Sequence, residues 1–299
     1  MLFRVFTLHP DIFRSFAANS LIARGLSKGV IALEQVNWRQ EYGLGKRKDV
    51  DAKPYGGGSG MVLQAEPIYQ ALSARQALSP LYRPPDAPLT YRKLYPNNAD
   101  FFNYVQARPV HKRVTISLTP RGFPYTQQTA EWLAARFETV NLVCGRYEGF
   151  DARADGCFDL ELSLGNFVLN GGEVAAMALI ESIARLVPGF VTKDTSILHD
   201  SFSKSGNYYH ETHEYVIGTR RLRQKPSLGA LPVRNSPTRN LFDNDAWLTR
   251  IAPQLEHPHF TRPEVWQNQT IPPVLLEGNH AKIQAWRSNW LQQSLSNQP

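Results

Sequence analysis

The sequence has few cysteines and no long apolar run, and these absences exclude several classes of protein. Only Cys144 and Cys157 occur among its 299 residues, with no CxxC motif and no histidine at zinc-binding spacing. A disulfide framework and a structural zinc site are therefore excluded. No stretch approaches the roughly 18 apolar residues of a membrane-spanning helix, and the N-terminus lacks a signal-peptide pattern. We expect a cytoplasmic protein with no membrane partner and no metal site.

Two common phosphate-binding motifs are also missing. The sequence contains neither GxxxxGK[ST] nor a GxGxxG following a strand, which argues against nucleotide triphosphates and dinucleotides as ligands. Glycine gathers instead at 54–61, 144–151 and 164–173. Such clusters let a backbone approach a ligand closely, although any one of them alone is more typical of a tight turn. Two of them follow predicted strands, where α/β sheets bind ligands, and they suit a nucleoside with an amino-acid tail.

Positive charge is concentrated in two segments. The chain has a net charge of +7 and a pI of about 9.4. Residues 83–113 hold six lysines and arginines against two acidic residues, and residues 201–250 hold eight against four. This distribution fits a polyanionic partner, and a solvated basic surface is the alternative.

Apolar periodicity predicts an α/β domain with a mostly parallel sheet over residues 1–190. A linker at 191–205 and a C-terminal domain at 206–299 follow, the latter with a basic insertion at about 206–252; a first insertion lies at about 82–111. The expected strands are 2–8, 30–38, 113–120, 139–145 and the start of 159–169. The expected helices are one after Pro10, then 66–77, 126–136, 173–187 and 279–293.

Seven motifs in a fixed order carry a family resemblance. They are PYGGGSGM, LVCGRYEGFD, LGNFVLNGGE, IARLVPG, HDSF, HPHFTRPEVW and PPVLLEGNHAKIQAWR. Together they resemble the TrmD-type bacterial tRNA (guanine-37-N1)-methyltransferases, which belong to the trefoil-knotted (SPOUT) methyltransferases. The resemblance covers about 1–80, 113–203 and 255–287.

The resemblance implies a trefoil-knotted methyltransferase domain and a smaller, mainly helical C-terminal domain that binds tRNA. It implies S-adenosyl-L-methionine as cofactor, Mg2+ as a helper ion without named ligands, and a homodimer with composite active sites and no DNA partner. The motifs assign cofactor binding to Leu118, Thr119, Pro120, Gly145, Arg146, Tyr147, Glu148, Gly149, Leu164, Gly165, Phe167, Leu169, Gly171 and Gly172. They assign tRNA contact to His259, Thr261 and Arg262.

The chemistry of guanine methylation requires a base and a cation. N1 of neutral guanine carries a proton that a base must remove, and the charge that spreads to O6 needs a positive partner. By resemblance, Asp200 in HDSF is the base and Arg185 in IARLVPG is the partner of O6. Outside these motifs, Asp200 would be interpreted as a helix N-cap and Arg185 as a solvated helix charge. Glu148 is interpreted equally well as a turn residue or a cofactor-side carboxylate.

The sequence departs from the family pattern at several positions. They are Ala52, Lys53, Asn166, Phe167 and Ala175, besides the two basic insertions, for which we expect extra phosphate contacts. Two other functions stay open: a knotted methyltransferase of ribosomal RNA or a ribose hydroxyl, and an RNA-binding module without activity.

Overall fold

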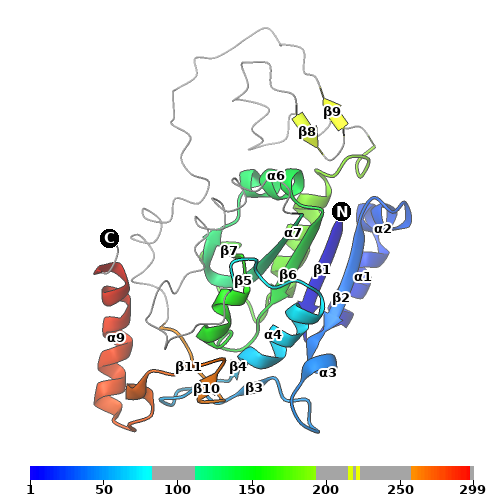
Figure 1. The fold of residues 1–299 in the computed structure, drawn as a ribbon. Helices are drawn as coiled ribbons and strands as arrows, with labels where there is room; N and C mark the ends of the chain where they lie inside the picture. The colour runs from blue at the N-terminus through cyan, green and yellow to red at the C-terminus, as the bar shows by residue number, and fades with distance from the viewer. Residues whose placement is uncertain (83–111, 193–214, 218–219, 223–256, 297–299) are drawn as a thin grey trace, which may run out of the picture.

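The structure of the protein, a computed structural model, describes residues 1–82, 112–192, 215–217, 220–222 and 257–296. Five parallel strands form a central sheet in the order β2-β1-β6-β5-β7 (Figure 1). They are β1 (Leu2–Thr7), β2 (Ala32–Asn37), β5 (Arg113–Pro124), β6 (Thr139–Cys144) and β7 (Leu160–Ser163). The predicted α/β class with a mostly parallel sheet is confirmed.

Helices and short strands surround this sheet. The α-helices are α1 (Phe13–Ala18), α2 (Ser20–Ser27), α3 (Trp38–Tyr42), α4 (Ala65–Ala74), α6 (Gln127–Arg136), α7 (Glu173–Ala184) and α9 (His280–Ser296). The 3-10 helices are η1 (Pro10–Ile12), η2 (Ala152–Cys157) and η6 (Pro273–Leu275). Antiparallel pairs join β3 (Asp51–Ala52) to β4 (Val62–Leu63), β8 (Tyr215–Ile217) to β9 (Arg220–Leu222), and β10 (Val265–Trp266) to β11 (Gln269–Thr270).

Alternating apolar residues build a core on each face of the sheet. In β1, Phe3 and Val5 pack with α1, α2, α6 and α7, whereas Phe6 packs with α4 and η2. Because successive strand residues point to opposite faces, a strand buried on both sides is apolar throughout. The same division holds in β6, where Leu142 and Val143 belong to different cores.

Strand β5 is longer than predicted because it is interrupted and then resumes. Leu118 and Phe123 both pair with Leu162 of β7, so residues 119–122 loop out of the strand. A Cβ on Gly122 would lie 2.6 Å from the backbone N of Leu162, and only glycine fits where the chain re-enters the sheet. Residues 119–122 are therefore not paired with β7.

Helix α7 ends earlier than predicted, at Ala184 instead of residue 187. The N–H groups of Leu186 and Val187 donate to Ile183 and Ala184 at 3.0 and 2.9 Å. These three-residue spacings tighten the last turn ahead of Pro188, where an α-helical hydrogen bond is lost.

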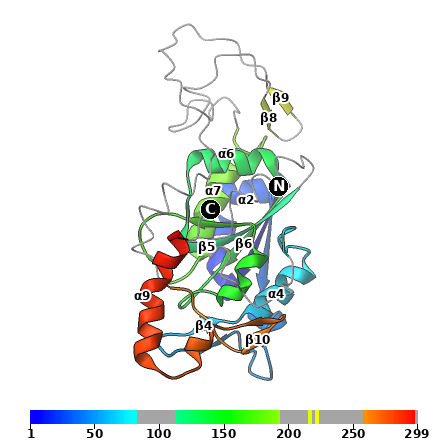
Figure 2. The same ribbon diagram turned by 60° about the vertical axis from the view of Figure 1, so that its left-hand side comes forward.

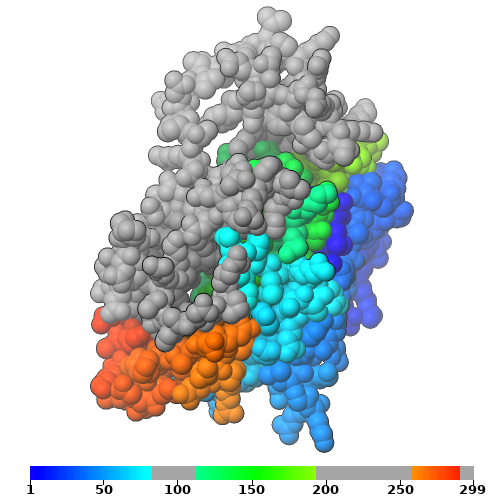
Figure 3. All heavy atoms as spheres, viewed as in Figure 1, coloured from blue at the N-terminus to red at the C-terminus, as the bar shows by residue number. Residues whose placement is uncertain are grey.

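A buried arginine attaches the C-terminal segment to the sheet domain. Arg153 forms an ion pair of 2.9 Å with Asp151, and both side chains are fully buried. Its guanidinium also donates to backbone carbonyls across 261–269, those of Thr261, Pro263, Glu264 and Gln269. Figure 1 shows β10 and β11 beside β3 and β4, Figure 2 shows β10 close to β4, and Figure 3 shows orange atoms of the C-terminal segment against cyan atoms of the N-terminal half. Residues 257–270 therefore share one packed unit with the sheet domain.

Several predictions fall on residues outside the described ranges. These include most of both basic insertions and the predicted linker with Asp200. The trefoil knot and the domain boundaries stay predictions. Among the described residues, no helix is long and apolar enough to cross a membrane.

Breaking the buried ion pair of Arg153 and Asp151 should lower the free energy of unfolding far more than breaking an exposed ion pair. We expect Asp151→Ala to lower the free energy of unfolding by about 3–5 kcal/mol, because it leaves the charge of Arg153 buried without its partner. The control is Lys112→Ala, which breaks an exposed pair with Glu138 and should cost less than about 1 kcal/mol. Urea unfolding measures both, and equal losses would contradict this account of Arg153.

Candidate active site

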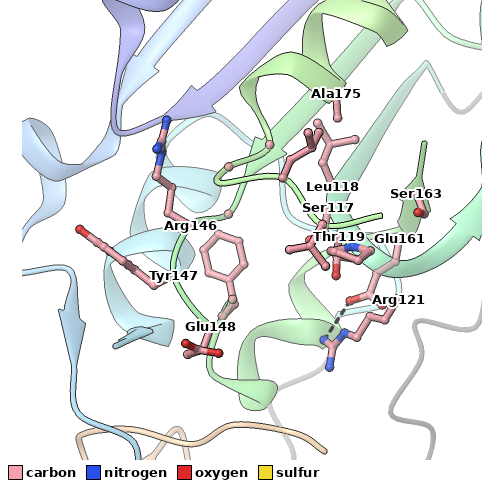
Figure 4. A pocket seen from close by; sticks show the side chains of 18 of the residues that line it. Ser117, Leu118, Thr119, Arg121, Arg146, Tyr147, Glu148, Glu161, Ser163 and Ala175 are labelled. Carbon is pink, nitrogen blue, oxygen red and sulfur yellow. Dashed lines mark hydrogen bonds and ion pairs between the residues drawn. The ribbon is translucent and has the colours of Figure 1, made fainter. Parts of the chain in front are cut away.

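Three loops at the carboxyl ends of β5, β6 and β7 enclose a cavity of about 280 Å³. Of the fourteen cofactor-binding residues predicted above, all except Gly165 line this cavity. Figure 4 shows the side chains of Arg146, Tyr147 and Glu148 on one side and Leu118 and Thr119 on the other. Loops from the ends of adjacent parallel strands meet at one sheet edge, which is where α/β proteins bind ligands.

The loop after β6 is a tight turn with unusual backbone angles. Tyr147 has φ +59° and Gly149 has φ +91°, and the N–H of Gly149 donates to the carbonyl of Arg146 at 3.1 Å. Gly149 in turn accepts a hydrogen bond of 2.9 Å from the N–H of Leu63. The turn RYEG thereby lies against the end of the glycine-rich stretch 54–61.

Backbone contacts join the loops after β6 and β7. Arg146 and Gly171 form an antiparallel bridge, and the N–H of Gly172 donates to the carbonyl of Gly145 at 3.1 Å. A Cβ on Gly172 would lie 2.8 Å from Cα of Cys144, so no other residue allows this approach. The cavity is therefore walled largely by backbone at this point.

A buried carboxylate fixes the joined loops to the sheet. Glu173, at the start of α7, is 2% exposed. It accepts a hydrogen bond of 2.8 Å from the hydroxyl of Thr7 in β1 and pairs with Arg146 at 3.0 Å. Sequence reasoning assigned Arg146 to the cofactor and missed Glu173, although a glutamate opening an apolar helix was a visible signal.

A second ionic cluster lines the cavity, and sequence reasoning missed it entirely. Arg121 lies 2.8 Å from Asp155 and 3.1 Å from Glu161, as the dashed line to Glu161 in Figure 4 marks. Burial raises the pKa of Asp155 to about 8, although Arg121 opposes this shift. Burial also raises the pKa of Glu161. The only signal was a glutamate within the apolar strand β7.

The predicted catalytic pair is not brought together within the described residues. Arg185 is exposed at the C-terminal end of α7 and does not line the cavity. Asp200 lies outside the described residues. Its position relative to Arg185 therefore stays a prediction.

The predicted tRNA contacts occupy three different environments. His259 lines the cavity together with His257, whose ring centroid is 4.7 Å away and which was not predicted. Thr261 is fully buried and its hydroxyl donates to the carbonyl of Lys53 at 2.8 Å. Arg262 is exposed, and its carbonyl accepts from Gln64.

A metal site is not visible in the part of the chain that the structure describes. None of the described histidine, cysteine, aspartate and glutamate side chains form a group of three or more that would hold a metal ion. The role of Mg2+ stays a prediction.

The fold is that of an α/β protein with a cavity at the carboxyl ends of three parallel strands. The profile of a family described as tRNA (Guanine-1)-methyltransferase TrmD matches residues 1–82, 97–225 and 238–298. The chain belongs to this family. The family and the enzyme class inferred from the seven motifs are thereby confirmed.

Individual relatives agree with the family match. A tRNA (guanine-N(1)-)-methyltransferase from Sorangium cellulosum is 35% identical over 287 residues, covering 95% of this chain and 86% of the relative. Proteins of the same name from Borreliella burgdorferi and Shouchella clausii are 33% and 32% identical, covering 96% and 97% of this chain and 86% and 85% of the relatives. The similarity therefore covers nearly all of this chain and 85–86% of each of these relatives.

The raised pKa of Asp155 predicts a dependence of stability on pH. Between its ordinary value of 3.8 and about 8, the folded chain holds a proton that the unfolded chain has lost. Rising pH through this window therefore destabilises the protein, and Asp155→Asn removes that slope. We expect the free energy of unfolding of the variant, relative to the unmodified chain, to rise by about 4 kcal/mol between about pH 5 and pH 9, since about three pH units of this window each contribute about 1.4 kcal/mol.

Urea unfolding at several pH values measures this difference. Glu138→Gln, which neutralises an exposed carboxylate, should keep the slope of the unmodified protein. Parallel stability curves for Asp155→Asn and the unmodified chain would contradict the assignment of a raised pKa.

Proposed function

We propose that the chain transfers a methyl group from S-adenosylmethionine to N1 of the guanine at position 37 of tRNA, on the 3′ side of the anticodon. The observation that carries the proposal is that three motifs of the matching family wall a single cavity. The relatives are named as enzymes that act on guanine N1 of tRNA. We assign the same reaction to this chain, in the cytoplasm, with tRNA and not DNA as partner.

The close approach of backbone groups to the cavity supports S-adenosylmethionine as its ligand. Gly171 and Gly172 leave no room for a Cβ, so backbone groups come close enough to contact a nucleoside directly. When bound, the cofactor supplies an electrophilic methyl group. The residues that would hold it are those of the three loops, with Leu118 on β5, Gly145 after β6 and Leu164 after β7.

The proposed catalytic roles follow from the charge changes at guanine. Asp200 would remove the proton from N1, and the guanidinium of Arg185 would stabilise the charge that develops on O6. Arg185 is exposed at the end of α7, which leaves it accessible to a base presented from solvent or from another subunit. Methyl transfer needs in-line placement and no covalent nucleophile, so positioning supplies most of the acceleration.

We further propose a homodimer whose active sites take residues from both subunits. Its support is an exposed apolar surface at the rim of the cavity, where Phe167 is 54% and Val168 83% exposed. Large apolar side chains that are exposed together in a single chain often mark a surface that another protein covers in an assembly. Residues 257–270 would present His259 and Arg262 to the tRNA, with Thr261 holding the segment in place.

Methyl transfer to tRNA transcripts tests the function directly. With labelled S-adenosylmethionine, we expect label on transcripts with guanine at position 37 and none on transcripts with adenine there. Asp200→Ala should reduce the rate by about 10²–10⁴-fold, because proton transfer then lacks its base. Asp11→Ala, which removes an exposed carboxylate, should leave the rate unchanged.

The other results of this assay discriminate between functions. Equal label on both transcripts would move the target to another nucleotide, as for a methyltransferase of ribose or of another base. No label, with tRNA still bound, would favour an RNA-binding module without activity.

The contact at Gly172 predicts a specific loss of cofactor affinity. Gly172→Ala must separate the loops after β6 and β7, because its Cβ would meet the backbone of Cys144. We expect calorimetry to show at least roughly tenfold weaker binding of S-adenosylmethionine, as for other losses of a preorganised site. Gly156→Ala, whose Cβ would lie 3.7 Å from the ring of Tyr82, is the matched control and should bind normally. Unchanged affinity in Gly172→Ala would place the cofactor elsewhere.

A further inference from the structure

The glycine-rich stretch between β3 and β4 is a motif of the family that the cavity does not use. None of residues 54–61 lines the cavity, and residues 57–60 are exposed. Gly56 and Gly57 have φ of +77° and +73°, angles that residues with a side chain rarely adopt. A Cβ on Gly57 would meet no atom within 4 Å. The backbone conformation, and not tight packing, therefore requires glycine at position 57.

Arg287 of α9 holds two consecutive carbonyl groups of this loop. Its Nη2 nitrogen donates to the carbonyls of Gly56 and Gly57 at 3.2 and 2.6 Å. A Cβ on Gly56 would lie 2.8 Å from Leu275 and 3.4 Å from Ile283, so the loop packs on the C-terminal segment at this point. Both carbonyls therefore point to one nitrogen, on the same side of the loop.

The N–H groups of the same two peptide planes point away from Arg287. In a trans peptide the N–H lies opposite to the C=O. The N–H of Gly57 therefore opposes the carbonyl of Gly56, and the N–H of Gly58 opposes the carbonyl of Gly57. Neither N–H donates a hydrogen bond to a described residue. Because Gly57 and Gly58 are exposed, two adjacent donors face solvent on one side of the loop.

The charge behind these two donors is positive. Among the described residues, the side chain of Arg287 donates to the two carbonyls and pairs with no carboxylate, and its Nε is buried without a hydrogen bond. A cation that binds the carbonyl of a peptide polarises it and strengthens the N–H donor on its other side. Successive backbone N–H groups in a turn form a common type of anion-binding site. The loop therefore has the chemistry of a site for an anion.

We propose that the N–H groups of Gly57 and Gly58 bind a phosphate of the tRNA backbone, with Arg287 supplying the positive charge behind them. This inference rests on the proposed function, because it takes tRNA as the partner. Backbone N–H groups are frequent donors to nucleic-acid phosphates, and such contacts fix the position of the bound strand. A Cβ on Gly60 would meet the carboxylate of Glu148, which lines the cavity. The phosphate site therefore adjoins the cavity wall and positions the strand that carries the target guanine.

Two substitutions at Gly57 that differ only in charge test the site. Gly57→Asp and Gly57→Asn have side chains of nearly equal shape, and both residues tolerate a positive φ better than most. We expect Gly57→Asp to bind a tRNA transcript with guanine at position 37 about tenfold more weakly than Gly57→Asn, because its carboxylate repels the phosphate at close range. The matched control is Gly29, which also has a positive φ and open space but precedes β2, at the end of the sheet opposite the cavity. Gly29→Asp and Gly29→Asn should bind the transcript equally.

The salt dependence of tRNA binding tests the role of Arg287. Each phosphate that a cationic site neutralises adds about one to the slope of log affinity against log salt concentration. Arg287→Met should therefore lower the magnitude of this slope by about one, and Arg287→Lys, which keeps the charge and a donor, should restore it. Lys282→Met removes a positive charge from the same helix, one that pairs with Glu277, and should leave the slope unchanged. Calorimetry with S-adenosylmethionine reports that each variant is folded.

The outcomes separate the phosphate site from the proposed function. Equal tRNA affinities of Gly57→Asp and Gly57→Asn would overturn the phosphate site. An equally large difference between the two Gly29 variants would overturn it too, because the effect would then be one of net charge. A loss of S-adenosylmethionine affinity in Gly57→Asp with tRNA binding unchanged would overturn it by assigning the two donors to the carboxylate of the cofactor. Failure of the unmodified protein to bind tRNA would overturn the proposed function itself, and the phosphate site with it.

Discussion

The cavity depends on the contact between two glycine-rich backbones at the carboxyl ends of β6 and β7. The bridge from Arg146 to Gly171 and the hydrogen bond from Gly172 to Gly145 hold the two loops at a distance that no side chain permits. Glu173 ties this contact to β1, since it binds both Arg146 and Thr7. The walls are thus set by the sheet and need little rearrangement on binding, which lowers the entropic cost of positioning a ligand.

Two arginines that pair with buried carboxylates differ in how completely their partners enclose them. Arg153 has its charge matched by Asp151 and its remaining donors taken by four carbonyls. Because all these contacts of Arg153 are buried, they rigidly connect the sheet domain to residues 261–269. Arg121 instead faces two carboxylates, and one oxygen of Asp155 accepts no hydrogen bond from the described residues. Carboxylates with raised pKa values at a cavity wall are candidates for a functional role.

The sequence alone predicted the five strands of the central sheet and the longer helices, because their apolar runs end at glycine or proline residues. The short strands outside the sheet were not predicted. The motifs also located the cavity, as all predicted cofactor residues but Gly165 line it. Pairings between distant segments escaped prediction. Arg121 and Glu161 are 40 residues apart, and each alone is an ordinary charge in the printed sequence. The loop-out of β5 was not predicted either, because it is defined by the pairing of both Leu118 and Phe123 with Leu162.

The segment assigned to tRNA and the loop assigned to the cofactor are joined by hydrogen bonds of both backbone and side chain. Asp151, two residues after Gly149, accepts from the N–H of Thr261, and Ala152 donates to the carbonyl of His259. A shift of residues 257–261 would therefore move the end of the RYEG turn, because the side chains of Asp151 and Arg153 that connect them are fully buried. Packed and hydrogen-bonded networks of this kind can carry energetic coupling between two sites. In this chain that connection is short, buried and made by two residues of opposite charge.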